Sequence, residues 1–182
     1  MSKPIAVLVG SLRKESYNLK VAKVLAQIAP SSLELKIIQI GDLPLYNEDI
    51  DADTPPAAYT RFRNEIAACK GVIFVTPEYN RSVPAVIKNA IDVGSRPYGK
   101  SVWSKKTAAI ISVSPGAIGG FGANHHLRQS LVFLDMPTLQ QPEAYFGGVA
   151  NAFDEKGHIV EKSQAFLKQF IDAYAAWFEK LS

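Results

Sequence analysis

The chain has 182 residues, of which 47% are hydrophobic and 20% are charged, and its formal net charge is +3. This balance is typical of a globular protein, so we expect a single domain over residues 1–182 rather than a disordered or membrane-spanning chain. The sequence contains no run of Lys and Arg long enough for a nucleic-acid-binding arm, so we expect no nucleic-acid partner.

The chain has one cysteine, Cys69, which excludes an intrachain disulfide and a Cys-x-x-Cys redox pair. Any redox chemistry must therefore come from a cofactor. The apolar run at residues 5–9 is too short for the core of a signal peptide or for a membrane span, and we expect a cytoplasmic protein.

Apolar runs of strand length recur in the first half of the chain and alternate with helix-like segments. Residues 5–9 are apolar throughout, which indicates a central strand covered on both faces. Residues 16–29 predict a helix, residues 33–40 a strand nearer the sheet edge, and residues 47–56 a loop before a second helix of about a dozen residues. The expected core face of the first helix comprises Ala22, Leu25, Ala26 and Ala29.

The second half continues the alternation, which predicts an α/β fold with a parallel sheet. Residues 72–75 and 108–113 predict two more strands, and a helix is expected from Pro84 to Ile91. We expect a fifth strand at residues 138–141. The final helix, residues 161–180, carries a broad aromatic face that belongs either to the core or to a dimer surface.

Three loops rich in glycine, proline or serine follow the expected strands, at the sheet edge where open α/β sheets bind ligands. In the first loop, Ser11, Arg13, Ser16 and Asn18 stand at the start of a helix. Their side chains and the helix N–H groups can wrap a phosphate. The loop lacks the glycine spacing of dinucleotide-binding folds and the Gly-Lys-Ser/Thr ending of the P-loop in nucleoside triphosphatases. The alternative is that the hydroxyls and the amide only cap the helix and Arg13 is an ordinary surface residue.

The second loop, residues 77–84, is enclosed by two prolines that limit its backbone freedom. Such a loop can aim backbone amides at a flat heteroaromatic ring, and Tyr79 can cover part of that ring. The alternative is an ordinary strand-to-helix turn with an exposed tyrosine. The third loop, residues 114–122, contains four glycines.

Two motifs in these loops resemble a known family. Residues 10–18 contain G-S-L-R-x-x-S-x-N and residues 77–80 read P-E-Y-N, the motifs of the NADPH-dependent FMN reductases, which include quinone, azo and chromate reductases. The resemblance extends through residues 88–92 and 126–129 to about Gly148. The sequence departs from many relatives at Val93-Gly94 and at Arg81, which leaves the preference for acceptor and nicotinamide donor open.

The resemblance implies a flavodoxin-like three-layer sandwich whose five parallel strands have the order 2-1-3-4-5. It implies FMN as the cofactor, NADPH or NADH as electron donor, and a quinone or another small molecule such as a flavin, chromate or azo compound as acceptor. It also implies a homodimer or homotetramer. The exposed part of the aromatic final helix or the helix near Leu127 can supply the contact surface. No side chain is expected to act as an acid or base, and no metal is expected. The expected cofactor-binding residues are Ser11, Leu12, Arg13, Ser16, Tyr17, Asn18, Pro77, Glu78, Tyr79, Asn80, Ser112, Val113, Ser114 and Gly116.

Two other functions remain open from the sequence. A flavodoxin-type electron carrier would bind FMN but recognise a redox protein, and a regulatory domain would keep the fold and bind another anion. Carriers of that family tend to be strongly acidic, whereas this chain is mildly basic. The sequence gives only weak support to three other candidate sites. These are a metal site at the adjacent His125 and His126, a calcium loop at residues 49–53 and a redox role for Cys69.

Overall fold

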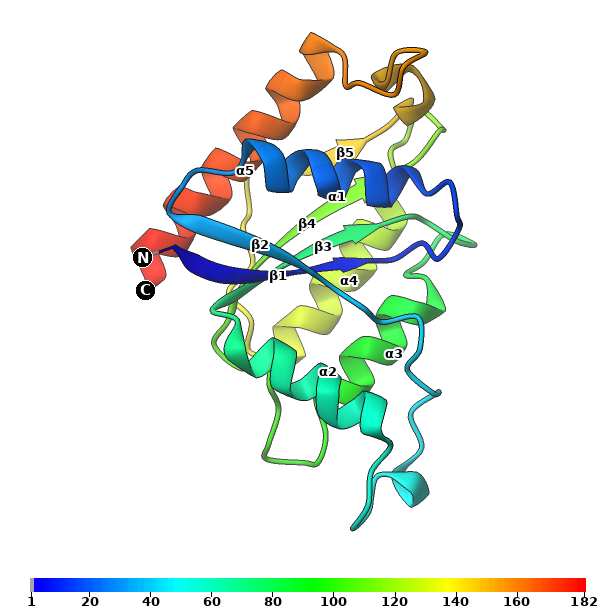
Figure 1. The fold of residues 1–182 in the computed structure, drawn as a ribbon, viewed down its shortest axis with the longest axis vertical. Coiled ribbons are helices and arrows are strands. Elements are labelled where there is room, and N and C mark those ends of the chain that lie inside the picture. Colours follow the sequence, from blue (N-terminus) through cyan, green and yellow to red (C-terminus); the bar gives the residue numbers. More distant parts are fainter. Residues whose placement is uncertain (1) are drawn as a thin grey trace.

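The computed structural model describes residues 2–182 and contains a sheet of five parallel strands. The strands lie in the order β2-β1-β3-β4-β5, so the amino-terminal strand stands inside the sheet (Figure 1). This result confirms the predicted strand order of a flavodoxin-like α/β fold. The strands are β1 (Lys3–Val9), β2 (Leu33–Ile38), β3 (Gly71–Thr76), β4 (Thr107–Val113) and β5 (Ala144–Phe146).

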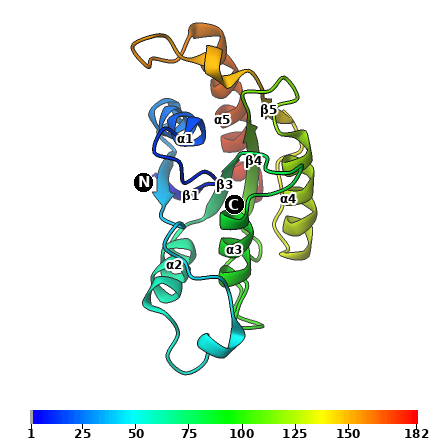
Figure 2. The same ribbon diagram turned by 90° about the vertical axis from the view of Figure 1, so that its right-hand side faces the viewer.

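Helices cover both faces of the sheet, which gives the three layers (Figure 2). Ile5 and Val7 of β1 belong to the core under α1 and α5, whereas Ala6 and Leu8 belong to the core under α2, α3 and α4. Alternate side chains of a strand point to opposite faces, so a strand that is apolar at every position supplies both cores. The helices are α1 (Tyr17–Ile28), α2 (Ala57–Ala68), α3 (Ala85–Gly94), α4 (Phe121–Phe133) and α5 (Glu161–Leu181).

The predicted fifth strand at residues 138–141 is wrong. Thr138 forms only an isolated bridge to Ala108, and the strand that pairs with the end of β4 is residues 144–146. Leu139 is buried, and its N–H donates to Ala108 O at 2.8 Å. Residues 140 and 141 are both glutamine, however, and Pro142 follows them, so the segment does not continue the ladder along β4. The strand therefore forms at the next short apolar run.

The predicted core face of α1 is wrong at Ala26, which is exposed. The buried positions include Val21, Ala22 and Leu25, which repeat at helical spacing and form one stripe with Asn18. Ala26 lies beside this stripe and faces solvent.

The aromatic face of the last helix belongs to the core. Phe170, Tyr174 and Phe178 of α5 are buried in the cluster under that face of the sheet. The Tyr174 hydroxyl lies 3.2 Å from Thr107 Oγ1 at the start of β4, which satisfies the polar end of this buried ring. The sequence left open whether this face packs in the core or forms a dimer surface, and in the structure these three side chains pack in the core.

Gly10 brings the first two loops together at the carboxyl edge of the sheet. Its N–H donates to Val75 O at 2.9 Å, which extends the pairing of β1 and β3 into the loops. A Cβ atom at this position would lie 2.7 Å from both Ile87 Cδ1 and Pro77 Cδ, and 3.0 Å from Pro84 Cγ. Only a residue without a side chain lets the first loop pack this closely against the two prolines of the second.

We expect Gly10→Ala to lower the free energy of unfolding by about 1–3 kcal/mol, because the added methyl group meets rigid proline rings. Urea denaturation followed by circular dichroism measures the change. Gly116→Ala is the matched control, since its Cβ would lie 3.5 Å from the nearest heavy atom, at ordinary contact distance. Equal stability of Gly10→Ala and the wild type would contradict this account.

Candidate functional site

A cleft of about 290 Å³ lies at the carboxyl ends of β1, β3 and β4, where their three following loops meet. Open α/β sheets place ligands at this edge because the buried strands end there and the loops become accessible. The lining residues are Ser11, Arg13, Ser16, Tyr17, Asn18, Pro77, Glu78, Tyr79, Val113, Ser114, Pro115 and Val149.

The amino-terminal end of α1 forms one wall of the cleft. Ser16 is the N-cap, and its Oγ accepts a hydrogen bond from Leu19 N at 3.1 Å. The first turn of α1 contains no acidic residue, so the partial positive charge of the helix terminus is not neutralised from within the helix. Asn18 is 5% exposed, and its Oδ1 atom has no hydrogen-bond partner among the described residues. The helix terminus therefore favours an anion at this wall, and Asn18 Oδ1 can accept a hydrogen bond from a donor group of a ligand.

The second loop is tied to α4 by side chains. Glu78 Oε2 accepts a hydrogen bond from Ala123 N, in the first turn of α4, at 3.1 Å. Ser82 Oγ lies 3.0 Å from His126 Nδ1 on the next turn. Tyr79 remains 48% exposed, so its ring is accessible beside the cleft. These contacts hold the loop in one position relative to the third loop, which leads into the same helix.

The third loop begins where β4 ends. Ser112 is fully buried, and its Oγ lies 3.4 Å from Asn124 Nδ2 of α4, so the hydroxyl points away from the cleft. Ser114 lines the cleft, and its Oγ accepts a hydrogen bond from Gly116 N at 3.1 Å. Val149 N donates to Ser114 O at 3.2 Å, which fixes the loop from the side of β5.

Comparisons with known proteins identify the family. Residues 4–151 match the model of the NADPH-dependent FMN reductases. The chain belongs to this family.

Similar proteins support the assignment over nearly the whole length. The chain is 65% identical to a quinone reductase of Pseudomonas putida over 173 residues, which covers 95% of this chain and 93% of that protein. It is 47% identical to a 2-hydroxy-1,4-benzoquinone reductase of Burkholderia sp, with 97% of each chain covered. Among solved structures, FerB of Paracoccus denitrificans, a flavoenzyme NAD(P)H:(acceptor) oxidoreductase, superposes with a TM-score of 0.91 at 45% identity over 98% of both chains.

Ten of the fourteen residues expected from the family motifs line the cleft. The other four do not: Leu12 is 62% exposed, Ser112 is buried, and Asn80 and Gly116 lie in exposed parts of their loops. A backbone contact to a ligand requires no lining side chain, so these four can still take part, and the binding roles expected for all fourteen residues stay predictions.

Sequence reasoning missed two residues that line the cleft, Pro115 and Val149. Pro115 stands between two expected residues of the third loop and could have been found from that position. Val149 follows β5 in a 3₁₀ turn, residues 149–152, and no motif marks it.

The structure places the weaker candidates outside the cleft. His125 Nε2 lies 2.6 Å from the Tyr145 hydroxyl, and Asp51 is held by both terminal nitrogens of Arg63 at 2.7 and 2.6 Å. Cys69 is buried, and burial raises the pKa of its thiol. Among residues 2–182, no group of three or more His, Cys, Asp or Glu side chains can hold a metal ion.

We expect Ser16→Ala to lower the free energy of unfolding by about 1 kcal/mol, because the Leu19 N–H loses its cap. Thermal denaturation of the protein without ligand measures the loss, which corresponds to about 2–4 °C in Tm for a chain of this size. Ser16→Asp should restore the cap and the Tm. Ser11→Ala serves as the control from the same loop, and an equal loss in both alanine variants would contradict the capping role.

Proposed function

We propose that the chain is an FMN-dependent oxidoreductase that passes electrons from NADPH or NADH to a quinone or a similar small acceptor. The observation that carries this proposal is the cleft in a chain of the FMN reductase family. The amino-terminal end of α1, which can bind an anion, and the exposed Tyr79 on the second loop both line it. The names of the Pseudomonas and Burkholderia relatives support a quinone as the acceptor.

The phosphate of FMN would be held at the start of α1. Ser11, Ser16 and Asn18 offer two hydroxyls and an amide, and Arg13 adds a planar fork of N–H donors. Leu12 and Tyr17 belong to the same segment and would contribute backbone and ring contacts. The unpartnered Asn18 Oδ1 fits this assignment, since a ligand hydroxyl can supply its missing donor while the amide nitrogen donates to the phosphate.

The flavin ring would lie against the second and third loops. We propose that residues 77–80 and backbone groups of Ser112, Val113, Ser114 and Gly116 border it. When bound, FMN supplies the redox chemistry, because its ring system takes a hydride from the nicotinamide and returns electrons to an acceptor. The protein orients the ring and offers backbone N–H groups, and we assign no side chain as acid or base and no metal.

We also propose that residues 1–182 form one FMN-binding domain that works in the cytoplasm. In the described part of the chain, no helix is both long and apolar enough to cross a membrane. A homodimer or homotetramer is supported by α4, where Val132 and Phe133 are 79% and 86% exposed beside a groove of about 910 Å³. Large apolar side chains that are exposed at adjacent positions of one helix are typical of a surface that contacts another protein.

Purification followed by a coupled assay tests the main proposal. We expect a yellow protein whose absorbance spectrum is that of bound flavin, and NADPH or NADH oxidation that requires added quinone. Bound flavin without turnover would indicate an electron carrier. Protein that binds no FMN under any condition would refute the proposal, and light scattering would measure the oligomeric state separately.

We expect Asn18→Leu to weaken FMN binding about tenfold, because a hydrogen bond to a charged phosphate is lost. The same variant should not lower the Tm of the apoprotein, because leucine removes a buried oxygen that has no partner. Fluorescence titration of the apoprotein with FMN measures the affinity. Lys23→Leu, at an exposed position of the same helix, is the control. A lower apoprotein Tm with unchanged FMN affinity would show that the amide serves the fold alone.

A further inference from the structure

The tip of the second loop is a two-residue hairpin turn with an unusual residue in it. Tyr79 N donates to Ser82 O at 3.1 Å, and Ser82 N donates to Tyr79 O at 3.0 Å. The two residues between them, Asn80 and Arg81, have φ angles of 51° and 64°. Positive φ at both central positions is the mark of a type I′ turn.

Arginine is a poor choice for the second central position of this turn. A side chain meets the backbone when φ is positive, so glycine is strongly preferred there, and asparagine at the first position is common. An unfavourable backbone conformation at a side-chain-bearing residue persists where the surroundings impose it, and such residues cluster at binding sites.

The turn is imposed by α4 and not by the arginine side chain. A Cβ atom on Gly122 of α4 would lie 2.8 Å from Arg81 O, which shows how closely the turn backbone approaches the helix. Ser82 adds its contact to His126 on the same helix. Glycine at position 81 would keep both contacts, so packing does not explain why the chain carries arginine.

The Arg81 side chain has most of its hydrogen-bonding capacity unused. It is 76% exposed, and its one ion pair among the described residues joins Nη1 to Glu78 Oε1 at 3.3 Å. An exposed pair of this kind contributes little to stability. Glu78 lines the cleft, so the pair holds the guanidinium beside a lining residue, although Arg81 itself does not line the cleft.

We propose that Arg81 binds a phosphate group of the dinucleotide electron donor and so sets the preference for that donor. The inference rests on the proposed function. NADH and NADPH both carry a pyrophosphate, and NADPH carries a further 2′-phosphate, whereas a quinone carries no such anion. The FMN phosphate is assigned to the other side of the cleft, at α1. A planar guanidinium beside the cleft is the group that recognises a phosphate oxyanion.

The test compares Arg81→Gln, Arg81→Lys and Arg81→Gly in the FMN-loaded enzyme. We expect the KM for the donor at saturating quinone to rise about tenfold in Arg81→Gln and Arg81→Gly, with a smaller rise in Arg81→Lys. The KM for quinone should not change. Direct titration with NADP⁺ and NAD⁺ should show the same loss of affinity without turnover. Losses for both dinucleotides assign Arg81 to the pyrophosphate, and a loss confined to NADP⁺ assigns it to the 2′-phosphate.

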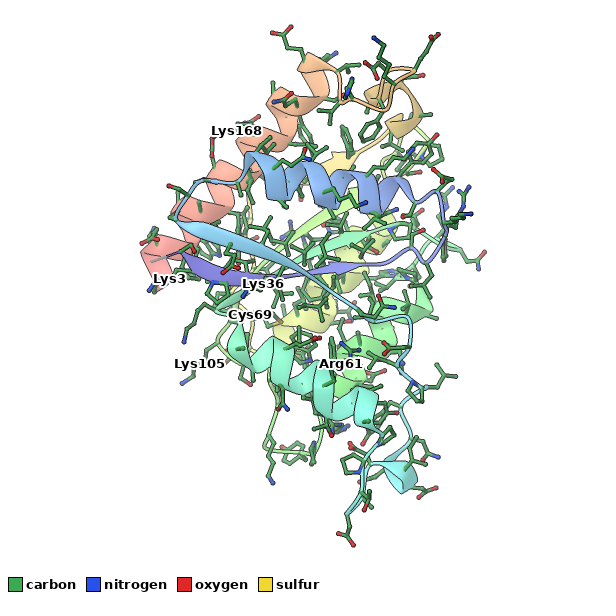
Figure 3. The ribbon with its side chains drawn as sticks, in the orientation of Figure 1. Lys3, Lys36, Arg61, Cys69, Lys105 and Lys168 are labelled. Carbon is green, nitrogen blue, oxygen red and sulfur yellow. The ribbon has the colours of Figure 1, made fainter. Side chains whose placement is uncertain are left out.

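Stability of the apoprotein gives a second readout. Arg81→Gly should raise the Tm by about 2–4 °C, because it relieves the strained backbone, while Arg81→Gln should not. Lys105→Gly is the matched control: Lys105 is an exposed cation with φ of 66°, and it precedes β4 at the opposite end of the sheet from the cleft (Figure 3). It should raise the Tm and leave every KM unchanged.

Unchanged donor KM and NADP⁺ affinity in an Arg81→Gln enzyme that turns over normally would overturn the inference and leave the proposed function intact. A wild-type protein that binds flavin but never oxidises either donor would instead refute the proposed function. A Tm for Arg81→Gly at or below that of the wild type would overturn the argument from strain.

Discussion

Burial of the central strands on both faces is the constraint from which the site follows. Every residue of β3 and β4 is buried, and the last five residues of β1 are buried as well. The polar side chains in these buried stretches, such as Thr76 and Ser112, make internal hydrogen bonds and are therefore not available to bind a ligand. Chemistry can occur only where the strands end. Because the strands are parallel, their carboxyl ends share one edge, and three loops distant in sequence meet there.

Meeting at one edge does not by itself give a defined cleft, since loops have many conformations. Two sets of contacts hold these loops in place. Gly10 lets the first loop contact both prolines of the second, and the first two turns of α4 hold the second loop through Glu78 and Ser82. The same helix reaches the end of β4 through Asn124. One rigid helix therefore positions the two loops proposed to border the flavin ring, so the spacing between them depends little on the loops themselves.

The sequence predicts those features that depend on local patterns. The buried strands and the Ser16 cap can be read from neighbouring residues alone, whereas most of the cleft-lining residues were expected from the resemblance to the family. The fifth strand was misplaced because its pairing depends on which segment reaches β4 after a turn at Pro142. The inward direction of Ser112 and the contribution of Val149 depend on α4 and on backbone contacts from a distant segment. The sequence marks Arg81 as a departure from relatives, but only the φ angles show that its position is strained.

The carboxylate of Glu78 lines a cleft that is proposed to bind anionic ligands, and a negative charge there should repel them. Its side chain is only 12% exposed, and one oxygen accepts a hydrogen bond from the first turn of α4. That helix has no acidic residue in its own first turn, so Glu78 supplies the negative charge that its terminus favours. The helix therefore stabilises the carboxylate whether or not Arg81 is paired with it. Arg81 can leave the long contact to Glu78 for a stronger anion, such as a phosphate, without leaving a buried charge uncompensated.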